Sequence, residues 1–590
     1  MLRDPCNAKP AGGWRAVLAI ALLLGWAAPA LATQKFGPLE LSGNLQSQNI
    51  VRTPDVDQYD FIQQRNTFRA RVEWNWLDRG KLIDRFDLPF IESSKLFLLY
   101  RGVYDSVYDY TPSFAERDFR GRKPLPPSPQ RLSDLPRSSL DALKFENDLR
   151  EAYIDLKLTD VPLSFRLGRQ QIVWGEADDF RMLDRANPLD TSWHFIEEIP
   201  PPSFGWDDLR IPLWMLKGLW DMGNIGPLSN VFTEAYWNPG DWRPVKISYL
   251  PRPWGLRIVD PLTNKEDGAF FAPFSGIVRL QNGTSLFKQG SYSRTPWSNS
   301  QFGIRTSGVF ENGLQLGLHY YYQRWSGDDG TPFTPVRGIP DTPSGRSRTN
   351  DLVAKGTLPV EYITPYINTV GLSGNYFEGN YTQTIFRLET IYDFGIRMLD
   401  RNRTTTFAPL LPGTIKRDYW KGMLAFDRPT WIRPLNKKTT FFITGQWFIH
   451  HIMHNKDTLA TALDLPTAGA RGRSFCGGPP NKPCNDPNGN GNFRDDVRSW
   501  ESLVTLAIFT FYKGGSVVPL AGVIYDPVNS NSVYPFWNLD YLITPNVIVN
   551  LTQRYFIPGQ SNPQKGVFDP WLLGTQRGRS ETALRLTYQF

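Results

Sequence analysis

The last ten residues of the chain alternate between apolar and polar side chains. From Leu584 onward every second residue is apolar, and the positions between them, such as Arg585 and Gln589, are polar. Successive side chains of a β-strand point to opposite faces, so this pattern predicts a strand with one face suited to lipid and one suited to water. The strand ends on an aromatic residue, Phe590, and it places Arg585 on the polar face.

The same alternation recurs along the chain from residue 39. Segments such as 65–76 and 149–158 carry one apolar and one charged face. The pattern predicts about eighteen strands, with sixteen or twenty as alternatives because the alternation is weakest between residues 230 and 300. The predicted strands are 39–50, 65–76, 95–105, 149–158, 163–173, 230–237, 245–258, 301–310, 314–325, 366–377, 382–394, 417–427, 439–453, 498–511, 516–525, 537–544, 546–556 and 580–590.

Two kinds of connection alternate between these strands. The short turns, rich in Gly, Pro, Asn and Asp, are Thr159–Pro162, Glu311–Gly313, Tyr512–Gly515 and Thr544–Asn546. The long polar segments are 106–148, 174–229, 259–300, 326–365, 454–497 and 557–579. An even number of antiparallel strands, with short turns at one end and long loops at the other, is typical of a transmembrane up-and-down β-barrel. We therefore predict an all-β fold with one barrel over 33–590.

A soluble β-sandwich is the alternative, because its strands also alternate. The aromatic residues favour the membrane barrel: many Trp and Tyr residues fall near predicted strand ends, where barrels place aromatic belts at the two membrane interfaces. These residues are Trp74, Trp76, Tyr320, Tyr322, Trp325, Trp447 and Tyr555.

The N-terminus carries an export signal. Three basic residues precede the apolar run 16–28, and Ala30-Leu31-Ala32 supplies small residues at the cleavage positions. We predict that residues 1–32 are a signal peptide removed after Ala32. The run is too short for a stable transmembrane helix, and the mean hydropathy of the chain is −0.38.

The charge of the chain gives little support to nucleic-acid binding. Removal of residues 1–32 takes away three basic residues and one acidic residue, so the net charge falls from +7 to about +5. The remaining basic residues are spread over many strands rather than clustered, and the chain is exported. We expect no nucleic-acid partner.

The terminal Phe590 resembles the closing residue of Gram-negative outer-membrane barrels. This resemblance implies an outer-membrane location, with lipid and the barrel assembly machinery as partners. Several separated motifs resemble an outer-membrane family catalogued as a domain of unknown function, number thirteen hundred and two. They are Leu167–Glu176, Asp184–Asp190, Trp297–Arg305, Phe386–Glu389 and Gly422–Pro429. The resemblance covers nearly the whole mature chain. It implies work beside an inner-membrane exporter and periplasmic lipid-handling proteins, and hence a hydrophobic cargo.

The segment from Trp174 to Trp220 is too long and too apolar for a solvated loop, and it also contains many carboxylates. We predict that this third outer loop folds into the barrel and narrows the pore. Its carboxylates would face wall arginines and create a transverse field. The alternative is an outer cap, with the arginines only solvating the lumen. The predicted pore-lining residues are Arg69, Arg71, Arg166, Arg169, Glu176, Asp178, Asp190, Arg387, Glu389 and Arg585.

One outer loop contains two further features. Cys476 and Cys484 lie close together, and the oxidising cell envelope predicts a disulfide between them. Asp486, Asn488 and Asn490 copy the first half of a calcium loop, but Val497 stands where a bidentate Glu belongs. A simple Asn/Gly surface loop is the favoured interpretation, with calcium as the alternative. We expect no other cofactor, since no C-x-x-C-H haem motif occurs.

These patterns favour an outer-membrane channel for small solutes, including hydrophobic or amphipathic ones. Eighteen strands enclose more space than side chains fill. The alternatives are a sheath around an electron-transfer cytochrome and a surface receptor or adhesin. We expect no enzyme, because the histidines fit polar lumen or interface positions better than a catalytic triad. They are His194, His319, His450, His451 and His454.

Overall fold

The computed structural model of the chain describes residues 33–55, 58–78, 81–82, 86–111, 141, 144–178, 180–189, 207–241, 288–289, 299–325, 336–354, 360–362, 365–400, 413–455, 459–460, 499–528, 531–557, 559 and 580–590. The predicted signal peptide, Asp190, the cysteine pair and the calcium segment lie outside these residues, and so does the predicted strand 245–258.

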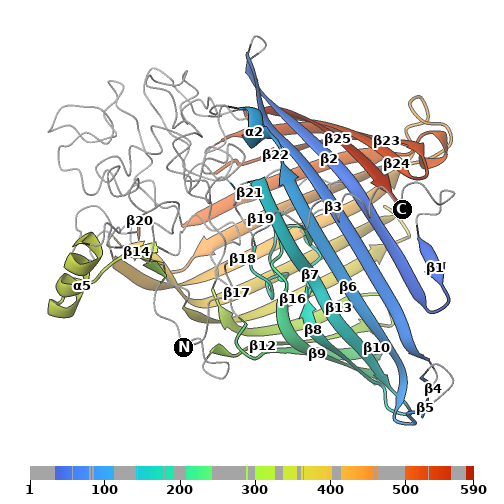
Figure 1. Cartoon of the computed structure of the whole chain (residues 1–590), viewed down its shortest axis with the longest axis horizontal. Helices are drawn as coiled ribbons and strands as arrows, with labels where there is room; N and C mark the ends of the chain where they lie inside the picture. The colour runs from blue at the N-terminus through green and yellow to red at the C-terminus, as the bar shows by residue number, and fades with distance from the viewer. Residues whose placement is uncertain are drawn as a thin grey trace.

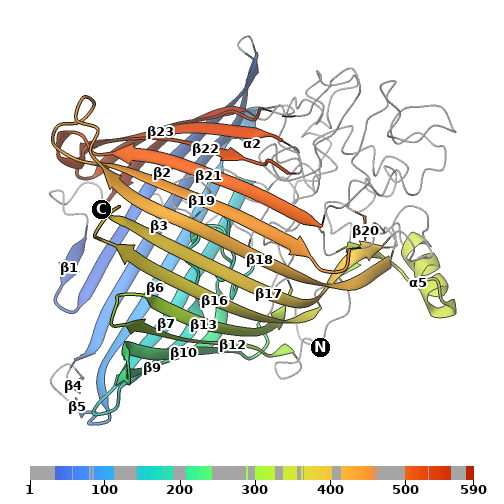
Figure 2. The same ribbon diagram turned by 180° about the vertical axis from the view of Figure 1, so that it is seen from behind.

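Within the described residues, eighteen strands form one antiparallel ring (Figures 1 and 2). In ring order they are β2 (Leu39–Asp55), β3 (Gln58–Asp78), β6 (Ile91–Asp105), β7 (Phe145–Leu158), β8 (Leu163–Gln170), β9 (Leu213–Ile225), β10 (Leu228–Asn238), β12 (Gln301–Phe310), β13 (Gln315–Arg324), β16 (Tyr366–Glu378), β17 (Thr384–Asp400), β18 (Gly413–Thr430), β19 (Phe441–Ile452), β21 (Trp500–Thr510), β22 (Val517–Tyr525), β23 (Val533–Thr544), β24 (Val547–Arg554) and β25 (Glu581–Gln589).

The last strand closes the ring on the first. β25 pairs antiparallel with both β24 and β2, with Arg585 opposite Gln48 and Tyr588 opposite Leu45. Beyond the last paired residues, Phe590 accepts a hydrogen bond from the Gly43 N–H at 2.8 Å and returns one to its carbonyl oxygen at 3.0 Å. Among the described residues, closure therefore pairs both edges of the barrel sheet, as a membrane barrel requires.

Shorter strands and helices lie at the two ends of the barrel. They are β1 (Gln34–Phe36), β4 (Lys81–Leu82), β5 (Phe86–Asp87), α2 (Val107–Tyr110), β11 (Lys288–Gln289), β14 (Val336–Gly338), α5 (Pro343–Ala354), β15 (Val360–Tyr362), β20 (Leu459–Ala460) and the 3₁₀ turn η6 (Lys513–Gly515). The C-terminus lies at the end that carries β1, β4 and β5, and α5 lies at the opposite end (Figure 1). Among the described helices, none is long and apolar enough to cross a membrane.

The predicted division into short turns and long loops is confirmed. The turns at the end that carries Phe590 are short, as between β7 and β8, β12 and β13, or β23 and β24. The connections β6–β7, β8–β9, β10–β12, β13–β16, β19–β21 and β24–β25 are long and share the other end. β2 and β3 run beyond the predicted bounds 39–50 and 65–76, to Asp55 and from Gln58, so the connection between them is also short.

One predicted strand assignment was wrong. The sixth strand is β9 (Leu213–Ile225), which falls inside the predicted loop 174–229. Both faces of its first half are apolar: Leu213 and Met215 are buried inside the barrel, whereas Trp214 is half exposed on the outside. The first half of β9 therefore shows no alternation between apolar and polar residues. The turn to β10 is tight, and Gly226 supplies its left-handed backbone at φ 58°.

The barrel wall separates an apolar exterior from an interior that carries polar groups. On β25 the predicted faces are confirmed, because Leu584 and Leu586 are exposed while Ala583 and Arg585 are buried inside. Trp74, Trp447 and Tyr555 are also exposed, as an interface belt requires. Trp325 is an exception: it is buried in a cluster with Ile367, Met398 and Tyr419. A closed barrel with an apolar outer surface places this protein in the outer membrane.

Candidate functional site: the inner segment and the lumen

The described part of the connection between β8 and β9 lies inside the barrel. We call residues 171–189 and 207–212 the inner segment. Its two legs are joined by Asn187, whose side chain accepts a hydrogen bond from the Ile172 N–H at 2.8 Å and donates to the Ile211 carbonyl oxygen at 3.0 Å. The same amide donates to the Gln170 carbonyl oxygen at 3.1 Å, so Asn187 fixes the point where the segment leaves β8 and returns to β9.

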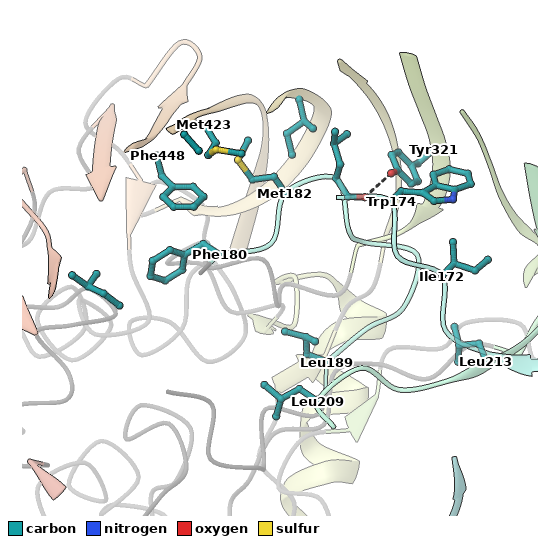
Figure 3. Packing of buried hydrophobic residues seen from close by; sticks show 14 of the residues in the cluster. Ile172, Trp174, Phe180, Met182, Leu189, Leu209, Leu213, Tyr321, Met423 and Phe448 are labelled. Atoms are coloured by element: carbon teal, nitrogen blue, oxygen red, sulfur yellow. Dashed lines mark hydrogen bonds between the residues drawn. The ribbon is translucent and has the colours of Figure 1, made fainter. Parts of the chain in front are cut away.

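An apolar cluster packs the inner segment against the wall (Figure 3). The ring centroid of Trp174 lies 5.3 Å from those of Tyr236 and Tyr321. Phe180 packs edge-on against Phe448 of β19, with centroids 5.3 Å apart. Such aromatic contacts stabilise the packing beyond the area they bury. The segment therefore crosses the lumen from β8 as far as β19.

Two buried charged groups on β17 hold the first leg. The carboxylate of Glu389, which is fully buried, accepts hydrogen bonds from the N–H groups of Glu176, Ala177 and Leu183. Farther along the strand, Asp393 forms a buried ion pair with Arg185. Both contacts satisfy polar groups of a chain segment that has no strand partner, which is what a buried loop needs.

The next charged contact on β17 involves Arg387. Its guanidinium donates to the Asp178 carboxylate at 2.7 Å and to the Glu176 carbonyl oxygen, and it also pairs with Asp427 at 2.8 Å. Asp178 accepts a further hydrogen bond, at 2.6 Å, from Gln446 of β19. Burial raises the pKa of Glu176, although Arg387 opposes the shift. Four predicted residues, Glu176, Asp178, Arg387 and Glu389, thus meet in one place.

The second leg is held on the other side of the lumen by Asp208. Its carboxylate pairs with Arg69 of β3 and with Arg101 of β6, the latter at 3.3 Å. Arg150 of β7 donates to the carbonyl oxygen of Asp207 at 2.6 Å. Burial alone would raise the pKa of Asp208, but the neighbouring arginines outweigh it and hold the pKa well below its ordinary range.

A β-bulge adds Arg150 to this cluster of arginines. Tyr100 pairs with Leu149 and Leu99 pairs with Glu151, so Arg150 is the extra residue on β7. The bulge turns Arg150 inward beside Glu151, whereas Leu149 is exposed on the outside. A strictly alternating strand would place these neighbours on opposite faces, which is why sequence alternation did not identify Arg150.

A cavity of about 700 Å³ lies below the inner segment, between it and the short-turn end of β2, β3, β6 and β7. Gln171, Val173 and Asp208 of the inner segment line its upper side. Ser42 and Gln589 line it near the short-turn end.

Arginines and aromatic rings form a stack on the wall of this cavity. Phe97 and Tyr153 stack with centroids 4.7 Å apart and 12° between their planes. Arg71 lies over Phe97 at 5.1 Å, and Arg166 lies over Tyr153 at 3.9 Å. Arg166 also binds the Asp155 carboxylate through two hydrogen bonds of 2.6 and 3.0 Å. The order of groups is guanidinium, ring, ring, guanidinium.

The remaining predicted lumen residues lie apart from the β17 contacts. Arg169 pairs with Asp148 at 2.9 Å, and Arg585 donates to Gln48 at 3.0 Å on the β25–β2 seam. The sequence analysis missed Arg101, although its place in the predicted strand 95–105 put it on the same face as Lys95. It also missed Asp208, because that pairing depends on the path of the inner segment.

Two of the histidines are described inside the barrel. His319 shares a 3.0 Å hydrogen bond with Ser373. His450 lies 3.3 Å from the Glu501 carboxylate and 3.2 Å from the Tyr419 hydroxyl. Within the described residues, no group of three or more His, Cys, Asp or Glu residues is arranged to hold a metal ion.

The chain was compared with curated proteins, solved structures and protein families. No curated protein matches the chain. Three similar solved structures are the outer membrane protein OpdK of Pseudomonas aeruginosa (8% identity, TM-score 0.38, 94% of this chain and 98% of that chain), OccK9 (OpdG) of the same organism (10%, 0.39, 94% and 98%) and OccAB1 of Acinetobacter baumannii (6%, 0.42, 94% and 96%). Similarity this low carries no argument about function.

The family comparison is more decisive. Residues 14–502 match the family described as a protein of unknown function, DUF1302. The match spans well over half of the chain and includes the motifs around Leu167–Glu176 and Phe386–Glu389 that the sequence analysis singled out. The protein therefore belongs to the DUF1302 family.

Proposed function

We propose that this protein is an outer-membrane channel for small amphipathic solutes, and that the inner segment narrows its pore. The observation that carries the proposal is the position of the segment inside the barrel, held on β17 through Glu389 and Arg387 and on β3 and β6 through Asp208. A loop with anchors on two sides of the lumen restricts the space left for a solute.

A partly exposed ion pair at the restriction supports selectivity. Asp178 is about half exposed, with 47% of its side-chain surface accessible, and it faces the guanidinium of Arg387. Fixed charges of opposite sign orient polar solutes and favour one ion over another. A solute that passes this point therefore meets the electric field of charged side chains instead of a neutral wall.

An apolar strip on the wall supports solutes with an apolar part. Leu520 of β22 is buried in the cluster that contains Phe448, and Phe509 pairs with Leu520 and packs on the same cluster. Phe442 stacks on Phe509 at 5.2 Å and is 37% exposed. β19 is the ninth strand on from β7, so this strip lies across the ring from the arginine-bearing wall. A lumen with one apolar and one cationic wall suits amphipathic solutes.

Deletion of residues 176–200 tests the channel and its restriction together. We expect the purified variant, in planar lipid bilayers, to show a single-channel conductance several-fold above that of the wild-type protein. The matched control is deletion of 113–137, an equally long part of the β6–β7 connection, and it should leave conductance within about 20% because conductance follows the narrowest part of a pore. Unchanged conductance after the 176–200 deletion would refute the restriction, and a wild-type protein that conducts no ions would refute the channel.

A further inference from the structure

We propose that the cavity beneath the inner segment is a binding site for a small organic monocarboxylate with an apolar body, and that Arg71 binds its carboxylate. This inference names a substrate class for the proposed channel and so rests on the proposed function. At about 700 Å³ the cavity lies within the range of ordinary small-molecule sites.

The arginines of the cavity differ in how much of their hydrogen-bonding capacity is already used by other groups of the protein. Arg69 and Arg101 are buried and hold Asp208, and Arg150 holds backbone carbonyl oxygens. These three groups maintain the structure of the inner segment. A ligand that displaced them would also detach Asp208, so they are poor candidates for reversible binding.

Arg71 differs because half of its side chain is exposed, at 50%. Its acidic neighbour is Glu73, and that carboxylate also pairs with Lys95. A second carboxylate, Glu40 of β2, lies near Arg71 and Lys95 and pairs with Lys35 at 2.8 Å. Three cations and two carboxylates leave a net positive charge at this part of the wall. The ring of Phe97 lies under the Arg71 guanidinium at 5.1 Å and limits its movement. A guanidinium held in this way can bind a carboxylate through two parallel hydrogen bonds.

The cavity also offers contacts for the apolar part of such a ligand. Val173 of the inner segment is 47% exposed, although it lines a cavity inside the protein. Leu99 of β6 pairs in register with Arg71 and lines the same cavity. An apolar group next to a guanidinium distinguishes an amphipathic carboxylate from an inorganic anion.

Acidic side chains at the cavity are already matched by cations, which keeps them from opposing an anionic ligand. Asp208 is held by Arg69 and Arg101, and Asp207 pairs with Arg210 at 2.6 Å. Glu151 lies beside Arg150 and close to Arg166. The carboxylates of the cavity are therefore already balanced by neighbouring cations.

Calorimetric titration of the full-length protein in detergent tests this site with four probes. We expect benzoate to bind, and benzamide, acetate and inorganic phosphate each to bind at least about tenfold more weakly, because each lacks the charge or the apolar body. Equal binding of benzoate and benzamide would overturn the role of the carboxylate. Equal binding of benzoate and phosphate would overturn the role of the apolar body.

Substitutions at Arg71 test whether this residue binds the carboxylate of the ligand. Arg71→Gln should weaken benzoate at least about tenfold, while Arg71→Lys should retain part of the affinity because it keeps the charge. The matched control, Arg433→Gln, removes an exposed arginine that lies over Trp431 in a short turn, and it should change nothing. Full benzoate affinity in a folded Arg71→Gln protein would refute the proposal.

The binding and channel hypotheses fail in different ways. A protein that conducts ions but does not bind benzoate keeps the proposed function and loses this site. A protein that binds benzoate through Arg71 but forms no conducting channel keeps the site and loses the proposed function. Conductance and calorimetry on the same preparation therefore separate the two outcomes.

Discussion

The fully buried carboxylate of Glu389 accepts a hydrogen bond from the backbone N–H of Leu183 at 3.2 Å. The same carboxylate accepts bonds from the N–H groups of Glu176 and Ala177. One side chain of the barrel wall thus satisfies three backbone donors of the inner segment. The local structure of the segment depends on a carboxyl group presented by β17.

We predict that Glu389→Gln loosens the inner segment. The variant keeps the size of the side chain but replaces one acceptor oxygen by an NH₂ group that faces backbone donors. Loss of a buried acceptor oxygen costs about 2 kcal/mol, which raises the population of detached segment roughly thirtyfold. Single-channel recordings should show greater current noise and a higher mean conductance.

Glu378→Gln is the matched control for this change. Glu378 also accepts backbone hydrogen bonds, from Asn380 at 2.8 Å and Thr382 at 2.6 Å, but it is the last residue of β16 and binds the exposed turn to β17. Its substitution should leave the current trace unchanged. Identical traces from the two variants would show that Glu389 does not hold the segment.

Ion selectivity should depend on Arg387 and Asp178 with opposite signs. Asp178→Asn removes an anion from the restriction and should shift the reversal potential toward anion selectivity, whereas Arg387→Gln should shift it toward cation selectivity. Opposite charges at a narrow point dominate the local potential. Measurements in asymmetric potassium chloride give both shifts.

The control pair lies at the start of α5, at the loop end of the barrel: Asp341 precedes the helix and Arg346 lies in its first turn. Asp341 and Arg346 form an exposed ion pair of 2.7 Å, and their neutralisation should leave the reversal potential within error. If both Arg387→Gln and Asp178→Asn leave selectivity unchanged, the ions take a path that avoids this contact.

Acidification should change selectivity through Glu176 before it affects the anchor at Asp208. Burial raises the pKa of Glu176, so this group gains its proton at a pH above the ordinary glutamate value of about 4.3. The pKa of Asp208 is lowered, so its ion pairs persist until the pH falls well below the ordinary aspartate value of about 3.9. When Glu176 gains its proton, the restriction loses negative charge while Asp208 still holds the second leg of the inner segment.

The stability contributions of the two groups have opposite signs. The lowered pKa of Asp208 stabilises the folded protein above its unfolded-state pKa, and this contribution is lost as pH falls through the folded-state value. The raised pKa of Glu176 acts in reverse, and favours the folded state as pH falls. A pH series of reversal potentials should shift toward anion selectivity above pH 4.3, and Glu176→Gln should abolish that component. A shift of wild-type size in the variant would assign it to another group.

The fold was largely predictable because one rule governs each strand. Alternation at residues such as Leu584 and Arg585 reflects lipid outside and the lumen inside, and this contrast holds wherever a strand crosses the membrane. The rule failed at β9, where Leu213 and Trp214 are both apolar because one packs on the inner segment and the other is exposed on the outside. A strand that faces a second protein layer no longer alternates in polarity.

The site was predictable only in part, for a related reason. Arg387 and Glu389 follow from strand parity, which places them in the lumen. Their partners do not, since the pairing of Arg185 with Asp393 or of Asp208 with Arg69 depends on the path of an irregular segment. Irregular backbone has no period from which to infer its path, and the bulge at Arg150 breaks the period within a strand.

Closure of the barrel should depend on the space that Gly43 leaves for Phe590. The Phe590 ring stacks on Phe68 with centroids 6.3 Å apart, and a Cβ on Gly43 would lie 2.7 Å from the ring and also against the Arg69 carbonyl oxygen. The backbone of Gly43 makes both terminal hydrogen bonds to Phe590. A Cβ at residue 43 therefore meets the chain end and the neighbouring strand together.

We predict that Gly43→Ala and Phe590→Ala both lower the fraction of folded barrel, measured by heat-modifiable migration in gels after refolding into detergent. Gly374→Ala is the matched control, because a Cβ there would meet its nearest neighbours at ordinary contact distances of 3.4 Å and more. Displacement of the final residue exposes the β25–β2 seam, so the effect of Gly43→Ala should exceed that of the control at least about threefold. Equal folded fractions for the two alanine variants would show that the ring of Phe590 has room to shift, and that the seam is held by the β2–β25 backbone ladder alone.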